Sequence, residues 1–247
     1  MIHATQNKVA MVTGAAGALG SELSLQLALT GWEVVLIDHK RRVLEQLYDR
    51  IVAQGGVKPV IHVVNLVTLD PQQCQEIVAA LETGPGRLDA LIHCAASFEG
   101  LRPSQHIEPQ VWLKQIQVNL NAPWLLSISS LELLRRAPSA SLVFLSENLE
   151  TVTSAYWGAY GVSKHGIQAL AAQLSSELSD SKIQVLAVNP GPMQSNLRSR
   201  VFYSENPAQL RSAAKVARIM IEILEGKRSA DSFKVDLSEP DRLPRQP

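Results

Sequence analysis

The sequence predicts an α/β fold, a doubly wound parallel sheet of seven strands with helices on both faces. Short apolar runs alternate with longer amphipathic runs from one end of the chain to the other. The short runs are apolar without interruption, as strands are when helices cover both faces of a sheet. No internal repeat, low-complexity linker or break in composition divides the 247 residues, so we expect one domain, residues 1–247.

Each expected strand is a short apolar run, and each expected helix spaces its apolar residues by three and four. The expected strands are residues 9–13, 33–37, 57–64, 88–93, 141–145, 183–188 and 232–235. The expected helices are residues 19–29, 42–53, 71–81, 111–134, 163–178 (entered near residue 158) and 207–224. Gly31 should stop the first helix, and Asp70 followed by Pro71 should cap the third. The proline-rich tail, residues 238–247, should be loose.

Charge and hydropathy argue against two classes of partner. Lys and Arg together number 23, as do Asp and Glu, so the net charge is zero. This balance argues against a nucleic-acid surface, although residues 40–42 form a small basic run. The first eight residues lack an apolar signal core, and no apolar run reaches the about 20 residues that span a bilayer. We therefore expect no nucleic-acid partner and no membrane.

The cysteines and histidines give no indication of a disulfide or a metal site. Cys74 and Cys94 lie in segments that should be buried or helical, so reduced thiols in a cytoplasmic protein are the default expectation. His106 and His165 have no carboxylate or histidine partner at metal-ligand spacing. No metal is expected.

The most informative stretch is residues 157–164, Trp-Gly-Ala-Tyr-Gly-Val-Ser-Lys. On the helix expected here, Tyr160 and Lys164 are four residues apart and stand on one face. A phenol titrates near pH about 10, and a neighbouring ammonium lowers that value. The pair is a candidate proton donor and acceptor near neutral pH. The alternative is two surface side chains that are helical neighbours by chance.

A glycine-rich turn, residues 13–20, joins the first strand to the first helix and contains Gly14, Gly17 and Gly20. Glycines permit a tight turn and a close approach of backbone to pyrophosphate, and the helix N-terminus presents unpaired N–H groups. With a strand before it and a helix after it, this turn predicts a Rossmann-type dinucleotide site. The alternative is a tight turn that binds nothing.

Asp38 ends the second strand, where an acidic residue receives the adenosine ribose. Its carboxylate would bond the ribose hydroxyls and repel a 2′-phosphate, which favours NAD. The basic run 40–42 follows at once and favours NADP, unless it is only the solvated start of a helix. We expect NAD, with NADP as the alternative.

With a glycine turn near its start and Tyr-x-x-x-Lys past its middle, the chain resembles the short-chain dehydrogenase/reductase superfamily from residue 8 to about residue 235. Further motifs match in order: Asn119 on the long helix, the strand leading to Ser146, and Asn-Pro-Gly at residues 189–191. Residues 157–160 and the loop 192–207 look most like a poorly characterised proteobacterial branch of oxidoreductases.

The resemblance implies an oxidoreductase that exchanges a hydride between a nicotinamide cofactor and a small carbonyl/alcohol substrate. It implies that Tyr160 transfers the proton, Lys164 lowers its pKa and holds the nicotinamide ribose, Asn119 holds a water in a proton relay, and Ser146 polarises the substrate oxygen. It assigns cofactor contacts to Gly14, Gly17, Leu19, Gly20, Asp38, Asn65, Leu66, Cys94, Ala95, Tyr160, Lys164, Pro190, Gly191 and Ser195. It also implies a homodimer or homotetramer, as do the broad apolar faces of residues 111–134 and 163–178.

Several positions depart from the family pattern. The middle glycine of the turn is Ala18, Cys94 replaces an asparagine after the fourth strand, and Asn65 replaces an aspartate that usually meets adenine. The gravest departure concerns the serine. Its usual place, thirteen residues before the tyrosine, holds Glu147, and Ser146 is one residue early. On a strand this slip reverses the side chain's direction, whereas a bulge would bring Ser146 into place.

If Glu147 faces the site, three roles remain open: a protonated donor, a partner for Lys164 or for a cationic substrate, or a lost catalytic group. Ionised, it cannot donate to a substrate oxygen, and near Tyr160 it would raise the tyrosine pKa. A different class of function therefore stays open, an NAD(P)-binding protein with weak or no turnover that acts as a sensor or interaction module. The substrate depends on loops 97–107 and 192–206.

Overall fold

The structure, a computed structural model, describes residues 7–230 and 233–238. The chain forms a seven-stranded sheet in the order β3-β2-β1-β4-β5-β6-β7, and each neighbouring pair is parallel. The strands are β1 (Val9–Thr13), β2 (Glu33–Asp38), β3 (Val60–Val63), β4 (Ala90–His93), β5 (Ala140–Leu145), β6 (Ile183–Asn189) and β7 (Lys234–Asp236). The predicted doubly wound parallel fold is confirmed.

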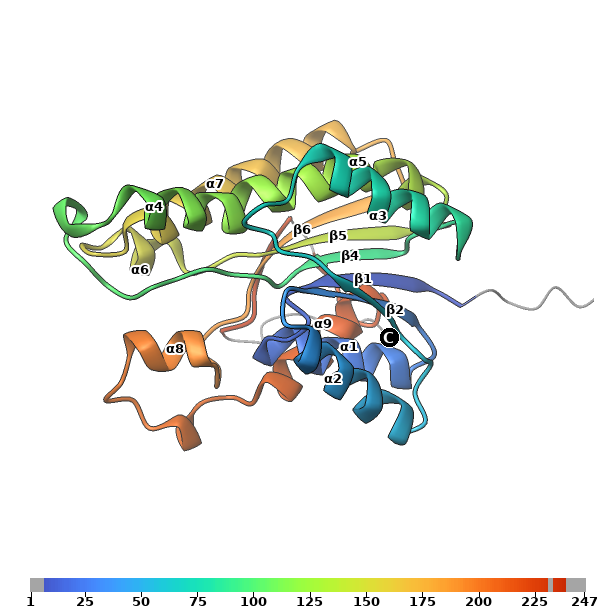
Figure 1. Cartoon of the computed structure of the whole chain (residues 1–247), viewed down its shortest axis with the longest axis horizontal. Coiled ribbons are helices and arrows are strands. Elements are labelled where there is room, and N and C mark those ends of the chain that lie inside the picture. Colours follow the sequence, from blue (N-terminus) through green and yellow to red (C-terminus); the bar gives the residue numbers. More distant parts are fainter. Residues whose placement is uncertain (1–6, 231–232, 239–247) are drawn as a thin grey trace, which may run out of the picture.

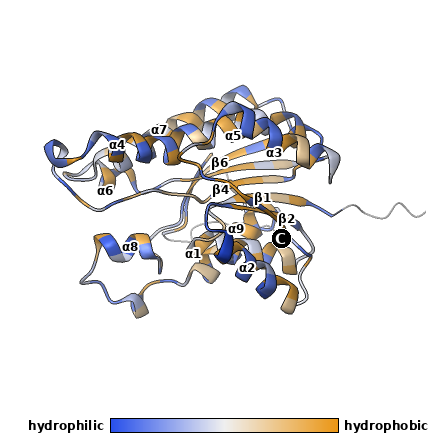
Figure 2. Cartoon of the chain, viewed as in Figure 1, coloured by the Kyte–Doolittle hydropathy of each residue, from blue (hydrophilic) through white to orange (hydrophobic). Residues whose placement is uncertain are grey.

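Helices cover both faces of the sheet (Figure 1). One face carries α3 (Pro71–Thr83), α4 (Pro109–Ile116), α5 (Ala122–Arg135) and α7 (Gly158–Glu177), and the other carries α1 (Ala18–Leu29), α2 (Arg41–Ala53) and α9 (Ala213–Leu224). Adjacent strand residues feed two cores: Met11 packs into the cluster under α3, α5 and α7, and Val12 into the cluster under α1, α2 and α9. The central strands β1, β4 and β5 are buried on both faces and are mainly apolar, whereas the edge strands β3 and β7 are partly exposed (Figure 2).

The long helix expected over residues 111–134 is interrupted, and the prediction of one continuous helix is wrong. A π-helical turn, Gln117–Asn121, separates α4 from α5. Pro123 has no N–H to donate to the carbonyl of Asn119, four residues earlier, and its ring crowds that carbonyl. A local π-helical turn accommodates both effects.

The bounds of several other elements also differ from their expected ranges, as three examples show. The last helix starts only at Ala213, where the Ser212 hydroxyl accepts the Lys215 N–H at 3.3 Å, and Pro207–Gln209 is a separate 3₁₀ turn. β3 begins at Val60 because Pro59 has no N–H for the ladder. β7 runs over Lys234–Asp236, whereas Ser232 and nearly all of the predicted loose tail lie outside the described residues.

Two short helices were not predicted, α6 (Leu149–Thr153) and α8 (Asn196–Val201). They follow β5 and β6, beyond the carboxyl ends of the strands (Figure 1). Each begins at a capping side chain, since Asn148 accepts the Thr151 N–H and Ser195 accepts the Arg198 N–H. Five- and six-residue helices carry too little periodicity to be found from the sequence.

The expected cap of α3 is confirmed and gives a test of stability. The Asp70 carboxylate accepts the Gln73 N–H at 2.8 Å, and the Gln73 side chain accepts the Asp70 N–H at 3.2 Å. Asp70→Ala should lower the free energy of unfolding by about 1 kcal/mol, measured by urea denaturation. Asp49→Ala, at an exposed position inside α2, should change it by less than about 0.5 kcal/mol. Equal losses in the two variants would contradict a role for the cap.

Candidate active site

The carboxyl ends of β1, β4, β5 and β6 meet at one edge of the sheet. The strand order changes direction at β1, which lies between β2 and β4, and Thr13 at its end pairs with His93 at the end of β4. Ligands of doubly wound sheets bind at such a switch point. The segments that follow these four strands carry most of the residues singled out in the sequence.

The glycine turn lies at the centre of this edge. Gly14 has a φ of +68°, and a Cβ atom there would lie 2.5 Å from the amide nitrogen of Ala95. A Cβ on Gly20 would lie 2.3 Å from the carbonyl oxygen of Gly14. Neither position tolerates a side chain. Gly17 is the N-cap of α1 and Ala18 its first residue, both exposed, so Ala18 meets no steric conflict and the first turn of α1 faces the open edge.

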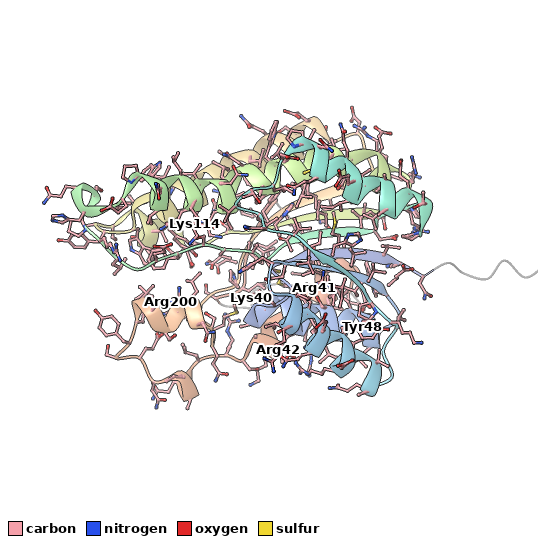
Figure 3. All side chains as sticks on the ribbon, viewed as in Figure 1. Lys40, Arg41, Arg42, Tyr48, Lys114 and Arg200 are labelled. Carbon is pink, nitrogen blue, oxygen red and sulfur yellow. The ribbon has the colours of Figure 1, made fainter. Side chains whose placement is uncertain are left out.

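The Asp38 carboxylate is bonded to the backbone around it. One oxygen accepts the Ala16 N–H of the glycine turn at 3.2 Å, and the other accepts the Lys40 N–H at 3.1 Å and lies 3.2 Å from His39 Nδ1. The basic run 40–42 is exposed beside it at the start of α2, as Figure 3 shows. Asp38 therefore stabilises the glycine turn through hydrogen bonds. The cationic run 40–42 follows Asp38 and is exposed to solvent.

Two other expected cofactor residues follow β3. The Asn65 side chain accepts the Val67 N–H at 3.1 Å, so it closes its own turn while remaining exposed. Leu66 is buried in the core below. Leu19, on α1, is likewise a core residue. The two leucines support the edge from beneath and present little side chain to a ligand.

Residues 189–191, at the end of β6, form a turn that is held by hydrogen bonds. The Gly191 N–H donates to the Asn189 side chain at 3.0 Å, and the Pro190 carbonyl accepts from the Arg211 guanidinium at 2.9 Å. Gly191 has a φ of +67°, which favours glycine. Ser195, expected to contact the nicotinamide amide, uses its hydroxyl to cap α8.

α7 holds the candidate catalytic pair at the end of β5. The Tyr160 hydroxyl donates to a carboxylate oxygen of Glu147 at 3.3 Å. The Lys164 ammonium donates to the Leu145 carbonyl at 2.7 Å and lies 5.4 Å from the centre of the Tyr160 ring. Both side chains point to the segment after β5, because they are four residues apart on one face of α7.

Ser146 is held by β6 and by α7. Its N–H donates to the Val188 carbonyl at 2.7 Å, which continues the ladder one residue past β5. The Ser146 hydroxyl accepts from the Gln168 amide at 2.7 Å. The expectation that Ser146 meets the substrate side of Tyr160 does not match this placement, since no bulge forms and Glu147 faces the phenol.

Gln168 was not singled out in the sequence. It is the third member of a row on α7, after Tyr160 and Lys164, in which successive members are four positions apart. All three bind the segment 145–147, so the row itself was the available signal.

Burial sets the titration of the catalytic pair. Burial, and secondarily the charge of Glu147, raise the pKa of Tyr160 well above its usual value. Burial lowers the pKa of Lys164 to about 8, against the opposing effect of the Glu147 charge. The expected lowering of the phenol pKa towards neutrality is wrong, because burial and a carboxylate outweigh the ammonium. Tyr160 keeps its proton at neutral pH.

Asn119 lies in the π-helical turn, which packs against α7. Its side-chain oxygen accepts the Ser97 N–H at 2.7 Å, and its side-chain amide donates to the Ser97 carbonyl at 2.9 Å. The side chain thus ties the turn to the segment after β4. Its backbone carbonyl cannot accept from residue 123, because that residue is a proline.

An aromatic cluster that the sequence did not reveal encloses Tyr160. We define it as Phe98, Trp157, Tyr160 and Phe202. The ring of Phe98 lies 4.8 Å from that of Tyr160 and 5.4 Å from that of Trp157, and Trp157 lies 6.5 Å from Phe202. The loops 97–107 and 192–206 thereby meet over the phenol, which is 3% exposed. Figure 3 shows Lys114 on α4 and Arg200 on α8 on the two sides of this edge.

The cysteines show no sign of reactivity. Both are free thiols, as expected. Cys94 follows β4, and burial raises its pKa to about 12, although the charge of Lys164 acts in the opposite direction. Cys94 therefore stays a neutral thiol beside the glycine turn.

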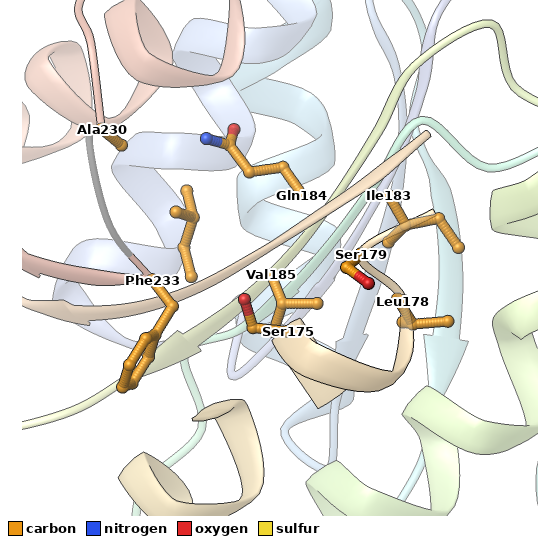
Figure 4. Close-up of a pocket in the computed structure, with 9 residues that line it drawn as sticks. Ser175, Leu178, Ser179, Ile183, Gln184, Val185, Ala230 and Phe233 are labelled. Carbon is orange, nitrogen blue, oxygen red and sulfur yellow. The ribbon is translucent and has the colours of Figure 1, made fainter. Parts of the chain in front are cut away.

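Other features lie away from this edge. A hollow of about 310 Å³ lies between the end of α7 and the start of β6, lined by residues that include Ser175, Leu178 and Phe233 (Figure 4). It adjoins the opposite end of β6 from Asn189. Within residues 7–230 and 233–238, no group of three or more His, Cys, Asp or Glu side chains is arranged to hold a metal ion. No helix in this described part is long and apolar enough to cross a bilayer.

Comparison with known proteins agrees with the geometry. The family model described as short chain dehydrogenase matches residues 8–206. The uncharacterized oxidoreductase YciK of Escherichia coli K12 is 28% identical over 218 residues, which cover 88% of this chain and 86% of that protein.

Solved structures extend the likeness to the whole fold. A short chain dehydrogenase from Salmonella enterica serovar Typhi is 28% identical, with a TM-score of 0.88 and coverage of 94% of this chain and 96% of that one. A short chain dehydrogenase from Shigella flexneri, complexed with NADP, is 27% identical, with a TM-score of 0.86 and coverage of 94% and 97%. These relatives bear out the resemblance to a poorly characterised proteobacterial branch. The chain belongs to the short-chain dehydrogenase/reductase family of oxidoreductases.

Proposed function

We propose that this protein exchanges a hydride between a nicotinamide cofactor and a carbonyl/alcohol substrate, with Tyr160 as the proton donor. One observation carries the proposal: α7 holds the Tyr160 hydroxyl and the Lys164 ammonium at the sheet edge that also carries the glycine turn. Residues 1–247 are taken as one domain that serves this site.

The residues present fit a dinucleotide. A Cβ atom at position 14 would meet the backbone of Ala95, and the first turn of α1 faces the same opening, so the turn suits a pyrophosphate. The cofactor, when bound, supplies or accepts the hydride. We assign its contacts to the glycine turn, to Cys94 and Ala95 after β4, and to the segment 190–195 after β6.

We propose NADP(H) in place of the NAD expected from Asp38 alone. The Asp38 carboxylate already accepts two backbone N–H groups, and the exposed run 40–42 offers cations to a 2′-phosphate. Arg41 lies 3.9 Å from Glu45, which makes Lys40 and Arg42 the better candidates. The Shigella flexneri relative complexed with NADP supports this choice.

In the reduction direction Tyr160 gives its proton to the substrate oxygen, and its raised pKa keeps that proton in place at neutral pH. Lys164 supplies a neighbouring charge and a donor to the nicotinamide ribose. Asn119 supplies the acceptor for a water through which the phenol is reprotonated. Ser146 takes no part in this proposal, because its hydroxyl is bonded to Gln168.

One observation favours a second function, that of a cofactor-binding sensor or interaction module. Glu147 stands where the family has a neutral hydroxyl donor, and the Tyr160 hydroxyl donates to it. A carboxylate there opposes the negative charge that develops on a substrate oxygen. A cofactor-binding sensor or interaction module with little turnover would tolerate such a change.

Cofactor choice can be tested by fluorescence titration of NADPH and NADH. The Lys40→Ala/Arg42→Ala variant should bind NADPH about tenfold or more weakly, since each charge-assisted bond to a phosphate contributes roughly 1.5 kcal/mol or more. Binding of NADH should change little. Lys58→Ala, another exposed cation, serves as the matched control. Tighter binding of NADH than NADPH by the wild type would refute the assignment.

The proton-transfer role can be tested with Tyr160→Phe and Glu147→Ser. Tyr160→Phe should lower turnover at least about a hundredfold with little effect on NADPH affinity, because only the proton donor is lost.

Glu147→Ser should raise turnover on neutral ketones. Alcohol oxidation needs the deprotonated phenol, so its rate should rise only at alkaline pH. Glu147→Ser removes one cause of the raised pKa of Tyr160 and should move that rise to lower pH. Full turnover in Tyr160→Phe would exclude the mechanism.

We also propose a homodimer or homotetramer formed through α4, α5 and α7. Trp124 and Ile128 on α5 are 46% and 41% exposed, and Val162 on α7 is 52% exposed. Light scattering should give a multiple of the 27.0 kDa chain mass at micromolar concentration, and Trp124→Glu/Ile128→Lys should give a monomer. Val52→Lys on α2 is the control. A monomeric wild type would exclude this assembly.

A further inference from the structure

The Glu147 carboxylate lies at the reacting end of the site and forms no ion pair with any described residue. One of its oxygens accepts from the Tyr160 hydroxyl at 3.3 Å, and the other accepts the Asn148 N–H at 3.2 Å. The residue is half-buried. Across the described residues, no ion pair joins Glu147 to a lysine, arginine or histidine. A partly buried carboxylate is costly unless something positive accompanies it.

Two cations lie near this end of the site without forming an ion pair with Glu147, although the charges of Lys164 and Glu147 attract each other through space. The Lys164 ammonium, the cation on the same row of α7, donates to the Leu145 carbonyl at 2.7 Å. Lys114, at the mouth of the site, forms an ion pair with Glu99 at 2.8 Å. Among the described residues the ion-pairing position beside Glu147 is thus open to a cationic group of the substrate.

The chemistry of carbonyl reduction also favours a positive charge on the substrate. As the carbonyl carbon gains a hydride, negative charge develops on the substrate oxygen, which must lie beside Tyr160 and hence beside Glu147. A neutral ketone meets repulsion there. A protonated amine on the carbon next to the reacting carbon offsets the developing charge and gives Glu147 a partner. The Tyr160 hydroxyl is then free to donate to the substrate oxygen.

The aromatic cluster indicates the rest of the substrate. Phe98 and Trp157 border Tyr160 and present apolar rings over the phenol. Such walls suit an apolar or aromatic body, and ring faces also attract a nearby cation. We propose that Glu147 selects amino ketones and amino alcohols, in which an ammonium group stands on the carbon next to the reacting carbon and an apolar group packs against Phe98 and Trp157.

This inference rests on the proposed oxidoreductase function and names its substrate class. In reduction, the carbonyl carbon takes a hydride from the reduced nicotinamide, and the π electrons of the C=O bond move to oxygen. That oxygen takes the proton of Tyr160, which solvent then replaces. Two electrons and two protons in total convert the ketone to the alcohol, and the ammonium group is unchanged.

A matched pair of ketones tests the selection. Phenacylamine, assayed at mildly acidic pH where its amine is protonated, and propiophenone differ only in an ammonium or a methyl group on the same carbon. With NADPH, the wild type should show a kcat/KM about tenfold or more higher for phenacylamine, as a partly buried charge contact implies. Glu147→Gln should bring the ratio close to one. Glu150→Gln, an exposed carboxylate on α6, should leave the ratio unchanged.

Direct binding separates this inference from the function on which it rests. Phenylethanolamine and its neutral analogue α-ethylbenzyl alcohol are titrated into the protein by calorimetry. Wild-type preference for the ammonium compound, lost in Glu147→Gln, supports the inference even if no ketone is reduced, and the failure then belongs to the oxidoreductase proposal. Reduction of both ketones with equal kcat/KM, or equal binding of the two alcohols by the wild type, overturns the inference. These wild-type comparisons decide it even if a Glu147 variant fails to fold.

Discussion

The attachment of α7 to the end of β5 is the contact on which the candidate site depends. Lys164 donates into the Leu145 carbonyl, Gln168 holds Ser146, and Tyr160 meets Glu147. Three hydrogen bonds from one face of a helix fix both the height and the rotation of α7 against the sheet. The phenol is consequently held at the edge where the strands end.

The attachment of α7 buries two ionisable side chains, Lys164 and Tyr160, and burial disfavours their charged forms. Lys164 is buried enough to lower its pKa to about 8, and Tyr160 sits between apolar rings and a carboxylate that together raise its pKa. Groups whose charged forms are disfavoured in this way are typical of sites that bind or transfer charge, and they work against stability. The unusual residue is Glu147, since it adds negative charge where hydride transfer to a carbonyl would add more.

The sheet explains why these groups meet. In a parallel sheet all carboxyl ends share one edge, so residues from the turns after β1, β4, β5 and β6 converge although they are distant in sequence. The glycine at position 14 lets the first of these turns touch the backbone after β4. The two loops that close over the phenol meet through Phe98, Trp157 and Phe202. The packing of the sheet thus fixes where the site residues lie, while the two loops determine which substrates can reach Tyr160.

The sequence by itself determined the features that depend on neighbouring residues. Uninterrupted apolar runs indicated the parallel sheet, Asp70 indicated its helix cap, and the four-residue spacing placed Tyr160 and Lys164 on one face. Pro123 is the local signal for the break in the long helix, which apolar periodicity alone does not show. The tertiary structure alone decided the rest. The fold brought Glu147 into a hydrogen bond with the phenol, and the glycine turn engaged Asp38. The pKa of Tyr160 followed from burial beneath Phe98, far away in the sequence. Local periodicity is encoded by adjacent residues, whereas the direction of a side chain beyond a strand and the electrostatic environment of a buried group are set by partners that only the fold brings near.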